Sequence, residues 1–223
     1  MKSIRIWDLP TRLFHWLLAL AVIGLLITGN VGGDAMNWHF RLGYTVFGLL
    51  AFRLIWGLIG GRWSRFTSFF PTPARLVRYL RGQATPEDLA GHNPLGAFSV
   101  LAMLLVLAAQ VASGLVSDDQ IAFAGPLTSL VSGNTVGFAS GYHKDIGQWL
   151  IIALIVLHVL AILFYWLAKK NNLFKSMLGG DKTLPATVEP AHDTFGTRVK
   201  ALVAIAVAAG IVYWVIQLGN TTF

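Results

Sequence analysis

Four histidines in the apolar part of the chain can bind a metal ion or a haem iron. His15 lies near the start of one apolar segment, and His39 opens the next one. His143 and His158 lie at the two ends of another segment, 15 residues apart, which is about 22 Å along a helix. This spacing predicts two imidazole pairs at two levels, His15 with His158 and His39 with His143.

Two imidazoles that face each other across a porphyrin are the axial ligands of a low-spin b-type haem, and helix bundles can hold such sites. One small metal ion bound by all four histidines does not fit, because the two levels are too far apart. The chain has no cysteine, which excludes thiolate zinc sites, iron–sulfur clusters and covalently attached haem. The pattern therefore predicts two b haems with bis-histidine ligation.

An alternative interpretation treats His39 and His143 as solvated residues at a membrane surface, and the other two histidines as buried for packing alone. Ionisable residues are rare inside membranes, and those that occur are usually functional. Together with the match of levels, this rarity favours ligation.

Two glycines are candidates for making room beside these imidazoles. Gly43 follows His39 by four residues, and Gly147 follows His143 by four. Each glycine therefore lies on the same helix face as its histidine, where a flat macrocycle would pass. The alternative is that these small residues only let membrane helices pack closely.

Two arginines are candidates for binding the haem propionates. Arg53 follows His39 by 14 residues, so it returns to nearly the same helix face at the deeper level. A buried arginine there needs a partner such as a propionate or a quinone oxygen, unless its side chain reaches the membrane surface. Arg12 precedes His15 by three residues and lies on the same side of that helix, which makes it a second propionate candidate.

The elements that carry these residues are those of a membrane protein. Of the 223 residues, 55% are hydrophobic and only 12% are charged, whereas soluble proteins average about 25% charged residues. Five segments are apolar enough to cross a bilayer as helices: 13–29, 39–59, 95–116, 146–168 and 201–218. We expect an all-α integral membrane helical bundle, with a four-helix di-haem core in residues 1–182 and a linker and additional helix in residues 183–223.

The distribution of positive charge predicts the orientation. Lysine and arginine gather before residue 13, between 62 and 81, and between 169 and 200, whereas the other loops hold only Arg41 and Lys144. The N-terminus should therefore be cytoplasmic and the C-terminus outside. This topology accounts for the net charge of +7, so nucleic-acid binding is not expected. Four further spans and a histidine in the first apolar segment argue against a cleaved signal peptide.

Three connecting segments also carry predictions. Within the cytoplasmic loop 62–94, residues 73–80 should form a short basic helix on the anionic inner leaflet. The external loop 117–142 is too apolar around 121–130 for a free linker, so we expect it to fold back on the bundle or meet a partner. The polar segment 171–197 should tether the fifth helix to the other four.

With these residues, the sequence resembles the bacterial cytochrome b561 and Ni/Fe-hydrogenase b-type cytochrome family, over about residues 4–182. The shared motifs occur in order and with family-like spacing. They are Trp7-Asp8-Leu9-Pro10-Thr11-Arg12-Leu13-Phe14-His15-Trp16, His39-Phe40-Arg41-Leu42-Gly43 with Arg53-Leu54-Ile55-Trp56-Gly57, Gly91-His92-Asn93-Pro94-Leu95-Gly96, and His143 to His158.

The resemblance implies a four-helix core that moves electrons between membrane quinone and a periplasmic redox partner, across the bacterial inner membrane. The partner would be a c-type cytochrome, a hydrogenase or another oxidoreductase subunit. The chain would be an electron-transfer subunit rather than a self-contained catalyst, since it has no nucleotide or flavin motif. The chain differs from the family in two ways: the fifth span lies outside the common core, and the interval from His143 to His158 is one residue longer than in several relatives, which calls for a local bulge.

Two other functions are alternatives to this one. The chain could instead be a membrane anchor or assembly subunit of a periplasmic oxidoreductase, with auxiliary haems. A histidine-based proton or metal transporter is a weaker alternative, because no acidic residue lies within a span to form a relay.

A quinone site is expected at the start of the third span. His92 and Asn93 precede it, and the resemblance places quinone near the corresponding loop of relatives associated with formate dehydrogenase. The alternative is that Asn93 is simply the N-cap of a helix that begins at Pro94. An external slot near Trp38 and Tyr142 would suit quinone entry at the outer haem.

Overall fold

Five long helices dominate the computed structural model, which describes residues 1–220. They are α1 (Leu9–Val31), α2 (Ala35–Ile59), α6 (Pro94–Leu115), α8 (Gln148–Leu167) and α10 (Phe195–Asn220). All five are long and apolar enough to cross a membrane, the fourth as a continuous stretch over Gly133–Leu167. The predicted class, a helical membrane protein with five spans, is confirmed.

Shorter elements connect these helices. They are β1 (Lys2–Arg5), η1 (Arg62–Ser64), α3 (Phe66–Phe69), α4 (Pro73–Leu80), α5 (Pro86–Ala90), η2 (Thr128–Leu130), α7 (Gly133–Gly141), the π turn η3 (Tyr142–Gly147), α9 (Leu173–Gly179) and β2 (Asp181–Leu184).

The chain forms two compact units, each assembled from three separate stretches of sequence. The first unit contains Met1–His15, Arg53–Ala102 and Ile155–Ala204. The second contains Trp16–Phe52, Met103–Leu154 and the chain from Ile205 onward. Each unit therefore takes one part of every long helix. His15 and His158 belong to the first unit, and His39 and His143 belong to the second.

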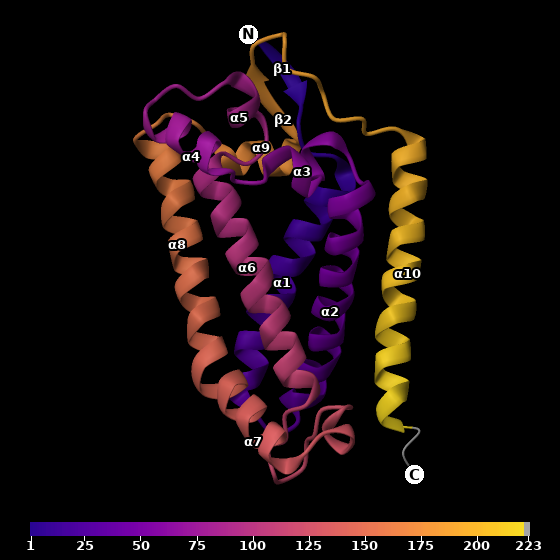
Figure 1. Cartoon of the computed structure of the whole chain (residues 1–223). Coiled ribbons are helices and arrows are strands. Elements are labelled where there is room, and N and C mark those ends of the chain that lie inside the picture. The colour runs from indigo at the N-terminus through magenta and orange to yellow at the C-terminus, as the bar shows by residue number, and fades with distance from the viewer. Residues whose placement is uncertain (221–223) are drawn as a thin grey trace. The chain divides into compact units, whose positions relative to one another are not determined.

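The first unit contains a two-stranded sheet, which was not predicted from the sequence. β1 pairs antiparallel with β2, Lys2 opposite Leu184 and Arg5 opposite Asp181, and the last pair forms a salt bridge of 2.7 Å. Four-residue strands are too short to show a clear alternation of polar and apolar residues. Segment 171–197 is therefore more than a tether, because it supplies a helix and a strand to this unit (Figure 1).

The predicted short helix at 73–80 forms with the expected bounds as α4. Its arginines, however, face a partner within the chain. Arg75 and Arg78 both form salt bridges with the buried Asp88 of α5, at 2.9 and 2.8 Å. Burial alone would raise the pKa of Asp88, but the Thr85 N–H and the two guanidinium groups outweigh it and lower that pKa. Much of the positive charge of α4 is thus neutralised locally.

In the second unit, a π turn interrupts the fourth long helix where His143 lies. Residues Tyr142–Gly147 form this turn, between α7 and α8. A π turn accommodates one extra residue within an otherwise α-helical segment. The local bulge expected from the long His143–His158 interval is confirmed.

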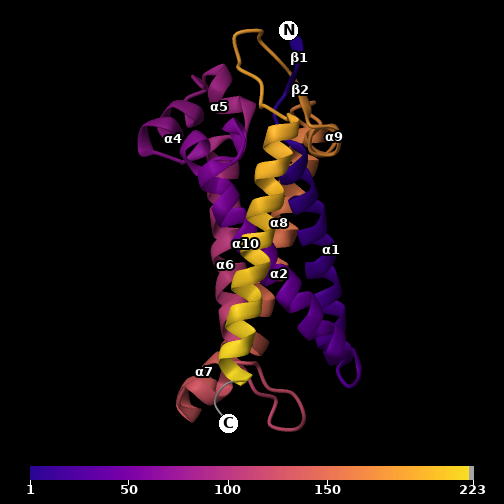
Figure 2. The same cartoon turned by 90° about the vertical axis from the view of Figure 1, so that its right-hand side faces the viewer.

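The external loop 117–142 folds back on the end of α6. This confirms the expectation that it folds back on the bundle. Gly125 N–H donates to Ser117 O at 2.7 Å, and Leu127 N–H donates to Leu115 O at 2.9 Å. At its tip, Asp119 Oδ1 accepts hydrogen bonds from three backbone N–H groups, which lower the pKa of Asp119. In Figure 2, α7 and the last turns of α10 lie at the same end of this unit.

Helix α10 contacts α2 within the second unit. A Cβ at Gly48 would stand 3.6 Å from Val212 Cγ2. The buried positions of α10 are alanines at 201, 204 and 208, so small residues let this helix approach its neighbours closely. Ala206 and Gly210 are exposed, and a Cβ at Gly210 would meet nothing within 4 Å.

Candidate functional site

The first unit brings His15 of α1 and His158 of α8 together. Their ring centroids are 6.3 Å apart and their planes are inclined at 47°. A metal–imidazole bond is about 2 Å long and each ring centre lies about 1.1 Å beyond its nitrogen, so two imidazoles on opposite sides of one metal have centres about 6.2 Å apart. The observed separation suits two axial ligands of one iron.

The second unit brings His39 of α2 and His143 of the π turn together in the same way. Their ring centroids are 6.1 Å apart, and the two planes are nearly perpendicular at 81°. Within residues 1–220, no three His, Cys, Asp or Glu side chains gather as a metal-ion site. Each pair therefore brings two imidazole rings together without a third side chain of these types.

Backbone carbonyls hold the imidazoles of His39 and His143 in one tautomer. His39 Nδ1 lies 3.2 Å from Leu25 O, and His143 Nδ1 lies 2.9 Å from Gln110 O. Because a carbonyl oxygen can only accept, Nδ1 must carry the proton in both rings. Nε2 is then the unprotonated nitrogen, which is the atom that binds a metal.

A repeated pattern on the neighbouring helices positions these two rings. Thr28 Oγ1 lies 3.3 Å from His39 Nδ1, and the next residue, Gly29, would carry a Cβ 3.1 Å from His39 Cε1. On α6, Ser113 Oγ lies 3.2 Å from His143 Nδ1, and a Cβ at Gly114 would be 2.8 Å from His143 Cε1. The sequence analysis missed these residues, although the Thr-Gly and Ser-Gly dipeptides were a visible signal.

The two glycines that were predicted beside the histidines have different surroundings. A Cβ at Gly43 would meet nothing within 4 Å, so the surface next to His39 is open, as a macrocycle requires. A Cβ at Gly147 would instead collide with Gln110 Oε1. The space beside Gly147 is therefore taken by the Gln110 side chain, because α6 packs there.

Arg53 has partners within the first unit. It is only 3% exposed, so its side chain does not extend to the surface. Its Nη1 donates to Ser64 O at 2.9 Å, and its guanidinium lies 4.8 Å from the Phe66 ring centroid. The carboxylate of Asp8 stabilises its charge. The sequence analysis did not link Arg53 to Asp8.

Asp8 organises the start of α1. It is fully buried and its Oδ1 accepts from Thr11 N–H at 2.9 Å, as an N-cap does. Its Oδ2 accepts from Ser64 Oγ at 3.1 Å. A Cβ at Gly61 would collide with the same carboxylate. This polar cluster therefore connects the beginning of α1 to the end of α2.

Arg12 Nε and His92 Nδ1 are buried nitrogen atoms of the first unit that make no hydrogen bond within the described residues. Arg12 Nη1 donates to Leu178 O at 2.6 Å, which leaves Nε free to bind an anion. A guanidinium N–H is a strong donor to a carboxylate. Arg12 therefore fits a haem propionate.

His92 is enclosed by aromatic rings. The centroids of Trp7 and Phe69 each lie 4.7 Å from that of His92. Burial lowers the pKa of His92 to about 3, and the positive charges of Arg53 and Lys182 act in the same direction. His92 is therefore neutral at physiological pH.

Asn93 is the N-cap of α6, so the capping role expected as the alternative to quinone binding is confirmed. Its Oδ1 accepts from Gly96 N–H at 2.8 Å. Its Nδ2 donates to Tyr165 OH at 2.9 Å, and that hydroxyl is also hydrogen-bonded to Tyr79 OH. Asn93 thus caps one helix and joins it to α8 and α4.

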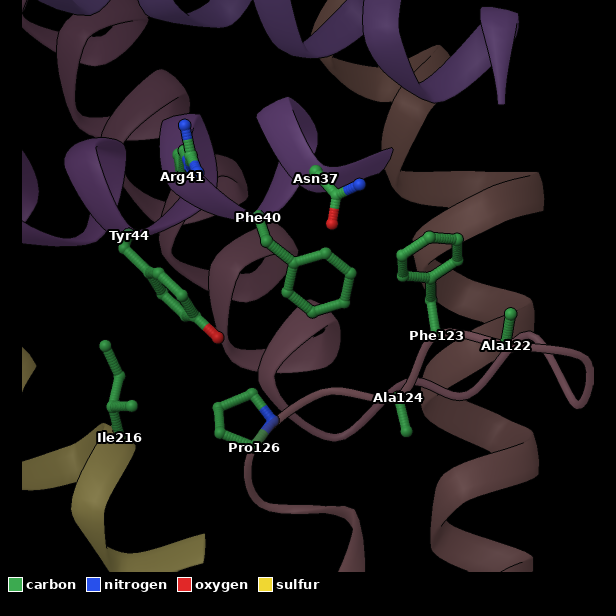
Figure 3. Close-up of a pocket in the computed structure, with 9 residues that line it drawn as sticks. All are labelled: Asn37, Phe40, Arg41, Tyr44, Ala122, Phe123, Ala124, Pro126 and Ile216. Atoms are coloured by element: carbon green, nitrogen blue, oxygen red, sulfur yellow. The ribbon is translucent and has the colours of Figure 1, made fainter. Parts of the chain in front are cut away.

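A pocket of about 450 Å³ opens in the second unit, between α2, α10 and the external loop. Phe40 and Phe123 face each other across it with centroids 6.1 Å apart. Figure 3 shows Asn37 directed towards the two rings and Tyr44 towards Pro126. The pocket combines flat apolar surfaces with an amide and a hydroxyl.

The chain matches known proteins over most of its length. The family model for the prokaryotic cytochrome b561 family matches residues 6–180. A probable Ni/Fe-hydrogenase B-type cytochrome subunit of Azotobacter vinelandii is 25% identical over 213 residues, covering 80% of this chain and 88% of the relative.

Two further relatives bear similar names. A probable Ni/Fe-hydrogenase 1 B-type cytochrome subunit of Escherichia coli K12 is 24% identical, covering 78% of this chain and 88% of its own length. A probable Ni/Fe-hydrogenase B-type cytochrome subunit of Cupriavidus necator is 24% identical, covering 82% and 88%. No solved structure matches the chain significantly. With five membrane-spanning helices, two facing histidine pairs and a family model that covers most of its length, the chain belongs to the prokaryotic cytochrome b561 family of membrane b-type cytochromes.

Proposed function

We propose that this protein transfers electrons across the membrane between quinone or quinol and a periplasmic redox partner, through two haem b groups. Family membership implies electron transfer by haem b. The observation that carries the finer proposal is that each unit contains one histidine pair, at centroid separations of 6.3 and 6.1 Å. Both separations suit one iron between two axial imidazoles.

The four histidines would be the axial ligands, His15 with His158 and His39 with His143. When bound, haem b supplies reversible one-electron chemistry, which none of the side chains in these sites provides. The chain contributes ligand orientation: the carbonyls of Leu25 and Gln110 keep Nδ1 protonated, so that Nε2 of both outer histidines is available for the metal.

Arg12 is the better candidate for a propionate partner. Its Nε is buried and makes no hydrogen bond to any described residue. Arg53 already contacts Ser64 and Phe66, so we propose that it stabilises the first unit and contributes positive charge near His15 and His158.

Quinone has two candidate locations. The first is the loop of His92 and Asn93, whose roles in capping and packing leave few free polar atoms. The second is the pocket between α2, α10 and the external loop, where Phe40, Phe123 and Tyr44 offer stacking surfaces and a hydroxyl. Quinone sites combine apolar walls with a few polar groups. The pocket supports the second location, which the sequence analysis placed at the same level near Trp38.

The names of the relatives support a hydrogenase as the partner of this chain, with a c-type cytochrome or another oxidoreductase subunit as the other candidates. We propose that the chain spans the bacterial inner membrane with its N-terminus in the cytoplasm, where the excess of lysine and arginine lies. In this position it would serve a respiratory chain as an electron-transfer subunit.

The competing proposal is a membrane anchor with auxiliary haems. Reduced-minus-oxidised spectra of the purified chain should show b-type bands equivalent to two haems. Added quinol should reduce them within the turnover time of the complex. Bands that quinol leaves oxidised would favour the anchor, and the absence of b-type bands would contradict both functions.

The quinone location requires variants with normal haem content. Tyr44→Phe should slow quinol-driven reduction if the pocket is the site, whereas His92→Ala and Asn93→Ala should slow it if the loop is the site. Wild-type rates in all three variants would exclude both locations.

A further inference from the structure

Gln110 of α6 contacts both the imidazole ring and the backbone carbonyl of His143. Its backbone carbonyl accepts the Nδ1–H of the imidazole at 2.9 Å, and its side-chain Nε2 donates to the backbone carbonyl of His143, also at 2.9 Å. The ring and the main chain of one histidine are therefore held by a single residue of the neighbouring helix.

The second of these contacts is made to a residue of the π turn. His143 lies within Tyr142–Gly147, where the backbone hydrogen bonds reach one residue further than in an α-helix. The backbone donor to this carbonyl is then five residues on instead of four, and a carbonyl oxygen has a second lone pair that can accept from a side-chain donor. The Gln110 amide supplies that donor. His39, in contrast, lies in the uninterrupted helix α2.

Packing alone does not explain an amide at position 110. Gln110 Oε1 is buried and has no hydrogen-bond partner in the described part of the chain. An apolar side chain of the same length would fill this space without burying an unpaired oxygen, which is unfavourable. The Gln110 amide also needs a glycine at position 147, since a Cβ there would collide with its Oε1.

We propose that Gln110 is a positioning residue that sets the plane of the His143 imidazole, with Gly147 providing the space for its amide. This inference rests on the proposed ligation of the outer haem by His39 and His143. Fixing both ends of His143 limits rotation about its side-chain bonds, and so maintains the 81° angle between the two imidazole planes.

The angle between axial imidazole planes has a spectroscopic signature. In ferric low-spin haem, nearly perpendicular planes give a highly anisotropic electron paramagnetic resonance (EPR) spectrum, whereas more parallel planes give a rhombic one. The outer haem should therefore show the highly anisotropic signal. The inner haem, with planes at 47°, should be the less anisotropic of the two.

The test compares variants of the full-length protein with both haems bound. Gln110→Met removes the donor at nearly constant volume, and Gly147→Ala displaces the amide while keeping it in the chain. Both should shift the outer signal towards a rhombic spectrum and change the midpoint potential of that haem only. The double variant should show little further change, because both substitutions break the same contact.

Gln148→Met is the matched control, since it makes the same chemical change in α8 but keeps the amide that binds His143 O. It should leave the spectrum unchanged. A wild-type signal and potential in Gln110→Met would overturn the proposal. Should that variant lose the outer haem altogether, Gly147→Ala decides the question by the same readout.

The wild-type protein separates failure of this inference from failure of the proposed function. If it holds only one haem, or if the outer haem is not bis-histidine low-spin, the proposed ligation is wrong. If both haems are present and only the Gln110 and Gly147 variants have no effect, the ligation stands and the positioning role is wrong.

Discussion

Thr28 and Ser113 lie in the same relation to two different histidines. Each hydroxyl oxygen is close to an Nδ1 atom, at 3.3 Å from His39 and 3.2 Å from His143. Each also lies three residues after the carbonyl that accepts from that Nδ1, and one residue before a glycine that packs on the ring. Helices α1 and α6 thus present equivalent surfaces to the outer pair.

Replacing Gly114 should weaken the outer haem site. A Cβ there would stand 2.8 Å from His143 Cε1, and overpacking of this kind costs about 1–3 kcal/mol. We expect Gly114→Ala to lower outer-haem occupancy, measured as haem per polypeptide after purification. Gly210→Ala, at a helical glycine with open space around it, should keep full occupancy. Equal occupancy in the two variants would argue against close packing on His143.

Replacing either member of a histidine pair should remove one haem. His15→Ala and His158→Ala should each leave only the outer haem, because a bis-histidine site loses half of its axial ligation. His39→Ala and His143→Ala should leave only the inner one. Pyridine haemochrome spectra give the count.

His192 provides the control for these substitutions. It is exposed, so His192→Ala should keep two haems, and His92→Phe should also keep both. Two haems retained in His158→Ala would contradict the proposed pairing.

The neutral state of His92 should make the protein less stable in acid. Its pKa is lowered from 6.5 to about 3 in the folded protein, so the unfolded chain binds the proton more readily as pH falls below 6.5. Stability from this residue is present above that pH and is lost on acidification, by about 2 kcal/mol at pH 5.

Thermal unfolding at pH 7.5 and pH 5 measures this loss. The comparison of interest is between the wild type and His92→Phe, which keeps an aromatic ring between Trp7 and Phe69 but cannot titrate. The variant should lose less stability than the wild type on going to pH 5. Identical pH dependence in both proteins would show that His92 titrates normally.

Asp88 should keep α4 and α5 packed together through its salt bridges with Arg75 and Arg78. Asp88→Asn would leave Arg75 without its charged partner, and breaking a buried ion pair costs about 3–5 kcal/mol. Because Arg78 is 37% exposed, we expect about 3 kcal/mol, the lower end of that range. Trypsin should then cleave this segment much faster, as seen by mass spectrometry of the fragments. Glu87→Gln, at an exposed acid in the same helix, should not change the cleavage rate.

Removal of the fifth helix tests the predicted boundary between residues 1–182 and 183–223, which stays a prediction. Deleting residues 201–223 should leave both haems bound, because α10 carries no histidine. The truncated chain should co-purify with less of any partner. Loss of a haem would show that α10 belongs to the haem-binding core.

The sequence predicted the features that follow from local periodicity. The length of the apolar segments predicted the five spans. The interval between His143 and His158 predicted a local bulge, which the structure contains as the π turn. The Asn93-Pro94 pair indicated a helix start, which the structure confirms. Each of these depends on residues close together in the chain.

Features that depend on how helices are rotated against one another were not predictable in this way. The carboxylate that stabilises the charge of Arg53 is that of Asp8, far away in the chain, and nothing in either local sequence indicates the other. The contact between Gln110 and Gly147 likewise requires the relative rotation of α6 and the π turn. A single sequence reveals which residues are unusual but not which neighbours they acquire.

The pairing of β1 with β2 sets an order for biogenesis. Strand Lys2–Arg5 is synthesised first, but it can pair only after Asp181–Leu184 has been synthesised. Four spans have been synthesised by then. Contacts of such long sequence separation form late. An affinity tag fused directly before Met1 would sit at this late junction, so a tag at the other terminus is the safer choice for purification.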